Sequence, residues 1–358
     1  MKKILIIFGT RPETIKLAPL IKEFKKYKSY FDIKVCNTSQ HKQMLREVLE
    51  IFDIKVDYDL DIMQDNQDLF TITILILERL KNVLDDFKPD LVIVQGDTNT
   101  AFVSALATFY KKIDVAHIEA GLRSYDKYSP FPEEMNRNLV SKIAKFHFVP
   151  TKLAKDNLLK ENISENIVIT GNTIVDSLYQ IIKNVEYNNI QDEFILVTLH
   201  RRENIARALK DICKAIKILA LNEKKIIFPV HLNPDVRKIV FKELKNIKNI
   251  TLLEPLPYDK FIYLLNKASL VITDSGGIQE EAVTLGKKII VVRDNTERQE
   301  IVDLKNVKIV GSSMEDIVNA VEYFTNTNFS NLKTNIFGDG NASKKIVSYL
   351  KEFYYGKD

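Results

Sequence analysis

Cysteine is almost absent from this sequence, and the two that occur, Cys36 and Cys213, lie far apart. They form no C-x-x-C pair, and neither belongs to a cluster with the ligand spacing of a zinc site. A disulfide framework is therefore excluded, and we expect two buried thiols in a protein of a reducing compartment. No Asp-x-Asp loop stands out as a metal site, so the sequence predicts no metal and no cofactor.

An excess of charge of one sign and long apolar runs are lacking as well. Lys and Arg number 52 against 48 Asp and Glu, and the charges are interspersed, which argues against a nucleic-acid partner. The longest uncharged runs, 69–77 and 98–110, are shorter than the ~18 residues of a membrane-spanning helix. The opening MKKILIIFGTRPE holds too short an apolar run for a secretory signal. We therefore expect a cytoplasmic protein with no membrane partner.

Short apolar, β-branched runs alternate with amphipathic stretches along the whole chain. Such runs predict strands covered on both faces, as in a parallel sheet flanked by helices. The predicted strands are 3–9, 33–38, 90–97, 115–121, 146–150 and 167–171 and, after a polar stretch at 183–193, 194–200, 225–231, 250–255, 270–276, 288–294 and 307–312. A last helix is predicted over 343–355. The 358 residues suit two domains, so we predict an α/β protein of two doubly wound domains that face one another.

The first predicted strand is followed by GTRPE, a pattern typical of an anion site. Gly9 permits a tight turn, Pro12 suits the first turn of a helix, and Arg11 and Lys16 add positive charge to the helix N-terminus. The alternative is that these two side chains are ordinary solvated helix charges. The glycine pattern G-x-G-x-x-G is missing, so the sequence does not support a nicotinamide dinucleotide fold.

A second candidate phosphate site is the segment LVITDSGGIQEE in the second half of the chain. Ser275, Gly276 and Gly277 offer backbone N–H groups at another predicted helix N-terminus, and two glycines allow a close approach of the backbone. Glu280 and Glu281 follow, and a carboxylate there can accept both hydroxyls of a ribose. This combination favours a nucleotide over the alternative of a glycine-rich turn with a capping carboxylate.

Titratable residues stand at several other predicted strand ends. Asp97 and Glu119 each close a strand of the first half, and Glu133 lies in the loop that follows the second of them. His200 and His231 close strands of the second half. Because ligands of such sheets bind outside the carboxyl ends of the strands, we expect a cleft with phosphate on one wall and acid or base groups on the other. For Asp97 alone, an N-cap of the following helix is the alternative.

Several long motifs make the chain similar to a known family. They are GTRPETIKLAPL, SQHKQML, QGDTNT, HIEAGLRS, SPFPEEMNR, TGNT, HRREN, PVHLNP, DSGGIQEEA and NTER. In this order they resemble the bacterial, non-hydrolysing UDP-N-acetylglucosamine 2-epimerases over nearly the whole chain. The resemblance implies a fold of two Rossmann-like domains of the GT-B type, with the active site in the interdomain cleft. The implied domains are 1–170 plus 343–358, with the acid and base carboxylates, and 171–342, which binds UDP.

The resemblance also implies an activity and the residues that perform it. Members interconvert UDP-N-acetylglucosamine (UDP-GlcNAc) and UDP-N-acetylmannosamine (UDP-ManNAc) through elimination of UDP to 2-acetamidoglucal, which supplies ManNAc for surface polysaccharide. The implied catalytic residues are Asp97, Glu119, Glu133 and His200. The implied UDP or substrate ligands are Arg11, Lys16, Arg137, His231, Ser275, Gly276, Gly277, Glu281 and Arg298. Gln40, His41, Glu134 and Arg201 match a second UDP-GlcNAc site of some members, and the family suggests a homodimer.

Other activities remain open from the sequence. A hydrolysing relative would release free ManNAc and UDP, but such relatives tend to continue differently after GTR. A retaining GT-B glycosyltransferase would need an acceptor groove, and a non-catalytic sensor of UDP-sugars would be expected to lack one of the three carboxylates. Gln95 stands where family members frequently have histidine, and Leu199 where they often have glycine. These departures bear on the preference among UDP-sugars.

Overall fold

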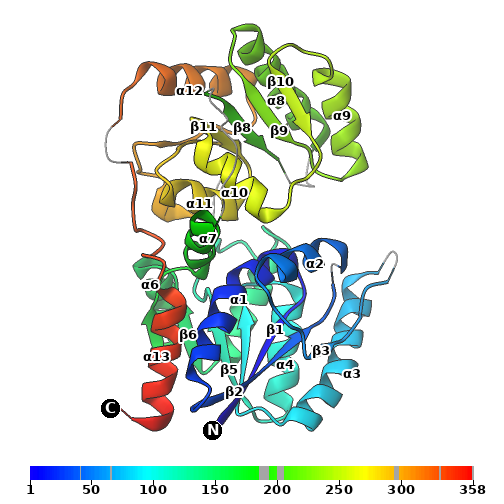
Figure 1. Ribbon diagram of the computed structural model, residues 1–358, viewed down its shortest axis with the longest axis vertical. Helices are drawn as coiled ribbons and strands as arrows, with labels where there is room; N and C mark the ends of the chain where they lie inside the picture. The colour runs from blue at the N-terminus through cyan, green and yellow to red at the C-terminus, as the bar shows by residue number, and fades with distance from the viewer. Residues whose placement is uncertain are drawn as a thin grey trace. The chain divides into compact units, whose positions relative to one another are not determined.

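The computed structural model describes residues 1–40, 42–64, 67–184, 193–199, 205–293, 298–329 and 332–356. The chain divides into two compact units (Figure 1). Unit 1 comprises Met1–Gln180 and Phe337–Asp358, and unit 2 comprises Ile181–Ile336. Each unit contains one parallel sheet with helices packed against it, so the predicted fold of two Rossmann-like domains is confirmed.

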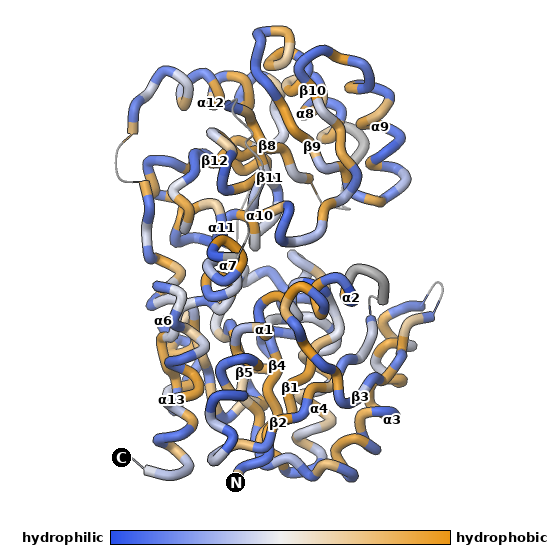
Figure 2. The backbone as a smooth tube through the Cα atoms, in the orientation of Figure 1, coloured by the Kyte–Doolittle hydropathy of each residue, from blue (hydrophilic) through white to orange (hydrophobic). Residues whose placement is uncertain are grey.

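Unit 1 is built on a seven-stranded sheet in the order β3-β2-β1-β4-β5-β6-β7. The strands are β1 (Lys2–Phe8), β2 (Phe31–Asn37), β3 (Tyr58–Asp59), β4 (Leu91–Gln95), β5 (Asp114–Ile118), β6 (Phe146–Val149) and β7 (Ile167–Ile169). The helices are α1 (Arg11–Phe24), α2 (Lys42–Ile51), α3 (Leu69–Phe87), α4 (Asn99–Tyr110), α5 (Glu133–Ile143), α6 (Lys152–Lys160), α7 (Thr173–Asn184) and α13 (Ala342–Tyr355), with a 3₁₀ turn at Lys25–Tyr27. Figure 2 shows the apolar character of the central strands. Because helices cover both faces, these strands need apolar side chains on both sides.

Unit 2 is built on a six-stranded sheet in the order β10-β9-β8-β11-β12-β13. The strands are β8 (Ile195–Thr198), β9 (Ile226–Pro229), β10 (Ile250–Leu253), β11 (Leu270–Thr273), β12 (Lys288–Val291) and β13 (Val307–Ile309). The helices are α8 (Ile205–Leu221), α9 (Pro234–Leu244), α10 (Tyr258–Lys267), α11 (Gly276–Thr284) and α12 (Met314–Asn326), with a 3₁₀ turn at Gln299–Ile301. One apolar core joins β8, β9 and β11 to α8, α9 and α12.

Every predicted strand is present, and β3 is the one strand of the described residues that the sequence did not predict. It is two residues long, Tyr58–Asp59, too short to leave an apolar run. The polar stretch at 183–193 falls mostly outside the described residues.

The unit boundaries differ from the predicted 1–170 plus 343–358. Unit 1 continues to Gln180 because α7 packs on α1, where Ser177 Oγ donates to the carbonyl of Ile15 at 2.5 Å. It resumes earlier than predicted, at Phe337, whose carbonyl accepts the N–H of Asn172 at 2.7 Å. The N–H groups of Ala342 and Ser343 also donate to Asp176, at 3.2 and 2.8 Å. The carboxylate of α7 thus serves the uncapped start of α13.

Each sheet has one point where the strand order reverses direction. In unit 1 it lies between β1 and β4, and in unit 2 between β8 and β11. Ligands of doubly wound sheets bind at the carboxyl ends of the strands at such a switch point. The residues that follow these four strands are therefore the first place to look for a site.

Both cysteines are buried, as predicted. Burial raises the pKa of the Cys213 thiol to about 12, which makes it a poor nucleophile at neutral pH. Within the described ranges, no helix combines the length and apolar character that crossing a bilayer would require.

Two buried histidines lie side by side in the first sheet. His117 of β5 and His147 of β6 are register partners, 0% and 2% exposed. Burial lowers the pKa of His117 to about 3 and that of His147 to about 4. Both rings therefore stay neutral in the folded protein at pH values where the unfolded chain, with a histidine pKa of ~6.5, binds protons.

We expect the free energy of unfolding to fall as the pH drops below ~6.5, because only the unfolded state then binds protons at these histidines. Each ring contributes a slope of up to ~1.4 kcal/mol per pH unit until the folded pKa is reached. Urea unfolding at several pH values between 7.5 and 5.0 measures this slope. His117→Gln keeps a side-chain donor but cannot titrate, so its slope should be smaller than that of the wild type. Equal slopes in the wild type and in His117→Gln would show that His117 does not stay neutral in the folded protein as described.

Candidate functional site

The turn that leads into α1 is held by a carboxylate of that helix, Glu13. The Oε2 atom of Glu13 accepts the N–H of Gly9 at 3.0 Å, the N–H of Thr10 at 2.8 Å and the hydroxyl of Thr10 at 2.7 Å. Its Oε1 atom accepts the hydroxyl of Thr98 at 2.6 Å. Burial raises the pKa of Glu13, and the bonds from Thr98, Thr10 and Gly9 act in the opposite direction. The N–H groups of Gly9 and Thr10, which precede α1, are therefore bonded to a carboxylate of the same helix, and a phosphate ligand role for Arg11 and Lys16 stays a prediction.

The space around Gly9 at this switch point is also filled. A Cβ atom on Gly9 would lie 2.0 Å from Thr38 Oγ1 and 2.5 Å from Thr100 Oγ1, so only glycine fits between them. The two threonine hydroxyls contact each other at 2.9 Å. The backbone of Gly9 is therefore packed closely against both threonines at the switch point between β1 and β4.

The N-terminus of α11, which follows β11 at the other switch point, is different. Ser275 occupies the N-cap, but its side chain makes no capping hydrogen bond, and the first turn holds no acidic residue. Among the described residues, no atom lies within 4 Å of the position that a Cβ on Gly277 would take. The first N–H groups of a helix have no acceptor within it and carry partial positive charge. This end of unit 2 can therefore receive a phosphate group.

Two adjacent carboxylates of α11 have separate partners. The hydroxyl of Tyr258 on α10 donates to Glu281 Oε1 at 2.6 Å, in a buried contact. Arg298 Nε donates to Glu280 Oε1, and both side chains are almost completely buried. The structure thus places Arg298, predicted as a UDP ligand, in an ion pair with α11. Sequence reasoning missed Tyr258, because nothing in the local pattern links it to a residue 23 positions away.

His231, two residues past the end of β9, is half-buried. Its Nδ1 atom accepts the N–H of Asn233 at 3.1 Å. A neutral imidazole that accepts at Nδ1 carries its proton on Nε2, so this ring can donate a hydrogen bond through Nε2 to an anionic group.

In unit 1, Asp97 follows β4 and is not an N-cap. The cap of α4 is Thr98, whose hydroxyl oxygen accepts the N–H of Ala101 at 3.0 Å. Instead, the Asp97 carboxylate accepts a bond from Arg137 Nη2, and its backbone carbonyl accepts one from Asn136 Nδ2 at 2.9 Å. The side chain of Asp97 remains 28% exposed, so it is held in place yet reachable from solvent.

Glu119 follows β5 and is 7% exposed. Its Oε2 atom accepts bonds from both Lys16 Nζ and Gln95 Nε2. Glu119 also has a φ of 64°, in the left-handed region that non-glycine residues rarely occupy. Such strained positions concentrate at functional sites, where the surrounding contacts hold them in place. Lys16, predicted as a phosphate ligand, directs its charge to this carboxylate.

Strand order and α5 bring the three predicted carboxylates to one edge of the sheet. Gln95 and Ile118 are register partners on β4 and β5, so Asp97 and Glu119 follow neighbouring strands. Glu133 is the first residue of α5, and the same helix supplies the Arg137 that contacts Asp97.

The residues predicted for a second UDP-GlcNAc site have mostly local contacts. Glu134 is 2% exposed and accepts the N–H groups of Ser124 at 3.0 Å and Tyr125 at 3.1 Å. Its carboxylate therefore fixes the loop before α5. Gln40 Oε1 accepts the hydroxyl of Thr100 at 3.1 Å.

His41 and Arg201 of that second site, and the predicted catalytic His200, lie outside the described residues. Arg11 is described; it is the first residue of α1 and is half-buried.

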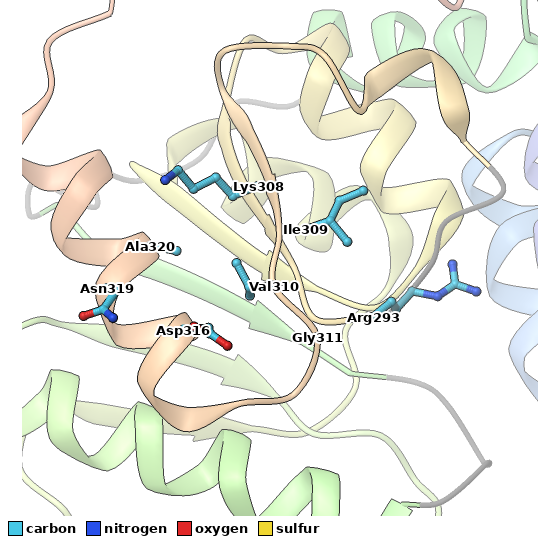
Figure 3. Close-up of a pocket in the computed structure, with 8 residues that line it drawn as sticks. All are labelled: Arg293, Lys308, Ile309, Val310, Gly311, Asp316, Asn319 and Ala320. Carbon is cyan, nitrogen blue, oxygen red and sulfur yellow. The ribbon is translucent and has the colours of Figure 1, made fainter.

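A pocket of about 520 Å³ lies beyond β13 in unit 2, but it holds none of the predicted site residues. It is lined by Arg293, Lys308, Ile309, Val310, Gly311, Asp316, Asn319 and Ala320 (Figure 3). Arg293 extends away from α12 in this view. In the described part of the chain, no three His, Cys, Asp or Glu side chains gather as a metal site.

Comparison with known proteins places this arrangement in context. Residues 22–351 match the family model for UDP-N-acetylglucosamine 2-epimerase. The UDP-N-acetylglucosamine 2-epimerase of Campylobacter jejuni is 48% identical over 98% of this chain and 97% of its own length. The crystal structure of UDP-GlcNAc 2-epimerase from Neisseria meningitidis bound to UDP-GlcNAc has a TM-score of 0.87 at 44% identity, covering 98% of this chain and 100% of that one. The S. aureus MnaA–UDP co-structure has a TM-score of 0.92 at 42% identity, covering 100% and 98%.

Removing the carboxylate of Glu13 should destabilise unit 1, because four donor groups lose their acceptor. We expect Glu13→Ala to lower the free energy of unfolding by ~3 kcal/mol. Glu13→Gln keeps a carbonyl oxygen for the N–H groups, so its loss should be ~1 kcal/mol. Urea unfolding of the three proteins at one pH measures both values. An alanine variant as stable as the wild type would show that the capping bonds are dispensable.

Proposed function

The chain belongs to the family of UDP-N-acetylglucosamine 2-epimerases, and on that premise we propose that it interconverts UDP-GlcNAc and UDP-ManNAc. The observation that carries the proposal is the group of acidic residues at the carboxyl ends of β4 and β5. Asp97 is held by α5, Glu119 is held by Lys16 and Gln95, and Glu133 begins the helix that supplies Arg137.

The reaction requires both a base and a stabilised leaving group. The proton on C2 of the sugar is not next to a carbonyl and is weakly acidic, so a base must remove it while UDP departs. The electron pair of the C2–H bond forms the C1–C2 double bond, the C1–O bond breaks, and UDP leaves with that bond's electrons. The products of this step are 2-acetamidoglucal and UDP. A positioned base contributes ~10²–10⁴-fold, and stabilisation of charge on the leaving group is the larger requirement.

We assign the leaving diphosphate to the N-terminus of α11. Ser275, Gly276 and Gly277 present N–H groups and a hydroxyl there, and His231 Nε2 can donate a further bond. Glu281, held by Tyr258, is placed to accept the ribose hydroxyls. Arg11 and His200 are proposed to complete the contacts with UDP on the basis of the family motifs.

The return step explains why more than one carboxylic group is needed. The UDP oxygen adds again to C1, and a proton is delivered to C2 from the face opposite to the one that lost it. A single side chain cannot stand on both faces of the ring. We propose that Asp97, Glu119 and Glu133 share these two transfers.

The same premise covers the setting of the enzyme. We propose a cytoplasmic homodimer that needs no metal or cofactor and supplies UDP-ManNAc for cell-surface polysaccharide. The hydrolysing reaction, which releases ManNAc and UDP, is the alternative outcome of the test below.

Proton NMR of the protein with UDP-GlcNAc in D₂O tests the function. We expect two UDP-sugars at a constant final ratio, both deuterated at C2, because the removed proton exchanges with solvent. Free ManNAc would indicate the hydrolysing reaction, and unchanged UDP-GlcNAc would contradict the proposal.

Asp97→Asn should still bind UDP in calorimetry but lose at least ~100-fold in turnover. A near-native rate in that variant would remove Asp97 from the mechanism.

Tyr258→Phe tests the ribose contact, because it removes the hydrogen bond that orients Glu281. We expect the Kd for UDP to rise about tenfold, as for the loss of one hydrogen bond to a charged group. The Kd for 2′-deoxy-UDP should change less, so the preference for the ribonucleotide shrinks. Tyr263→Phe on the same helix is the matched control. An unchanged preference in Tyr258→Phe would show that Glu281 does not bind the ribose through this arrangement.

A further inference from the structure

Gln95 is a buried polar residue that contacts Glu119 but takes no part in the proton transfers proposed above. It is the last residue of β4 and is 3% exposed. Its amide nitrogen donates to Oε2 of Glu119, 24 residues further along the chain. The carboxylate has no hydrogen to offer, so the amide must present its NH₂ group in this contact.

The two contacts on Glu119 come from different parts of unit 1. Lys16 reaches Oε2 from α1, and Gln95 reaches the same atom from the end of β4. Gln95 pairs with Ile118 in the sheet, so Glu119 is the residue directly after Gln95's partner. The φ of 64° at Glu119 turns the chain there. A lysine ammonium is a rotatable point charge on a flexible stem, whereas an amide is a planar donor. Two donors from separate elements restrain the position of Oε2 more than Lys16 alone does.

The chemistry of an amide suits this position. Hydrogen bonds to the charged form of a carboxylate favour that form, and an amide supplies them without titrating. The other charged groups described above at this edge of the sheet are Lys16 from α1, Asp97 after β4, and Glu133 and Arg137 from α5. A histidine at position 95 is a group that can gain a proton and add a positive charge beside Glu119, whereas an amide cannot.

We propose that Gln95 is a positioning residue, which holds Glu119 ionised and correctly oriented for proton transfer at C2. This proposal rests on the proposed epimerase function and adds Gln95 to the residues that determine its rate. It predicts that the rate of the chemical step, more than substrate binding, depends on the Gln95 amide. It also predicts that an uncharged donor here keeps activity constant over a wider acidic range than histidine would.

The test compares kcat and KM for UDP-GlcNAc from pH 5 to 9 in the wild type and two variants. Gln95→Leu removes the donor, so we expect kcat to fall about tenfold with KM within twofold, and the acid limb of kcat to move up by about one pH unit. Gln95→His restores a donor, so we expect near-native kcat at pH 8, and an additional loss in the acid range where the ring is protonated, because a positive charge beside Glu119 makes it a weaker base.

The control is Asn306→Ala, which removes another buried amide, 3% exposed, that donates to the Lys287 carbonyl at 2.7 Å in unit 2. It should lose stability without moving the pH profile. A Gln95→Leu profile that matches the wild type, or a change in KM alone, would overturn the inference. If Gln95→Leu does not fold, a Gln95→His variant with the wild-type acid limb overturns it instead. If the wild type leaves UDP-GlcNAc unchanged, the proposed function is contradicted. If the wild type is active and the variants have the same kcat and pH profile, only the role of Gln95 is contradicted.

Discussion

The hydrogen bonds that the Glu13 carboxylate accepts at the start of α1 are the interaction that distinguishes this helix from α11 of unit 2. Two doubly wound sheets each offer a switch point where a phosphate could bind. In unit 1, Glu13 accepts the N–H groups of Gly9 and Thr10 there, and Thr38 and Thr100 pack against Gly9. In unit 2 the corresponding helix, α11, begins with a serine that does not cap it and two glycines. The two helix starts therefore differ in their hydrogen bonding, and this difference is the basis for assigning the diphosphate to α11.

The charged residues of α1 near this switch point also contact the ends of other elements of unit 1. Glu13 also accepts the hydroxyl of Thr98, which ties α1 to the start of α4 directly beside Asp97. Lys16, one turn further along α1, contacts Glu119. The edge of the first sheet thus becomes a set of carboxylates whose positions are fixed by an arginine, a lysine and an amide. This is the arrangement that acid and base chemistry at a carbon requires, because geometry precedes pKa in selecting a proton acceptor.

The sequence predicted the strands and the sites with different success, for physical reasons. Fully covered parallel strands need apolar side chains on both faces, so each left a continuous run that could be recognised, except the two-residue β3. The Ser-Gly-Gly turn before α11 was recognisable because its chemistry is local. The capping box of α1 also had a local signal in the spacing of Thr10 and Glu13, which was not used for the prediction. The contacts of Glu119 with Gln95 and of Glu281 with Tyr258 could not be predicted, because they join separate elements and depend on tertiary packing.

The most direct measurement is a crystal structure of the protein with UDP bound. The account predicts diphosphate oxygens within hydrogen-bonding distance of the Gly276 and Gly277 N–H groups, with Glu13 still bonded to Gly9 and Thr10. A diphosphate on the N–H groups of Gly9 and Thr10, with the Glu13 carboxylate displaced, would contradict it.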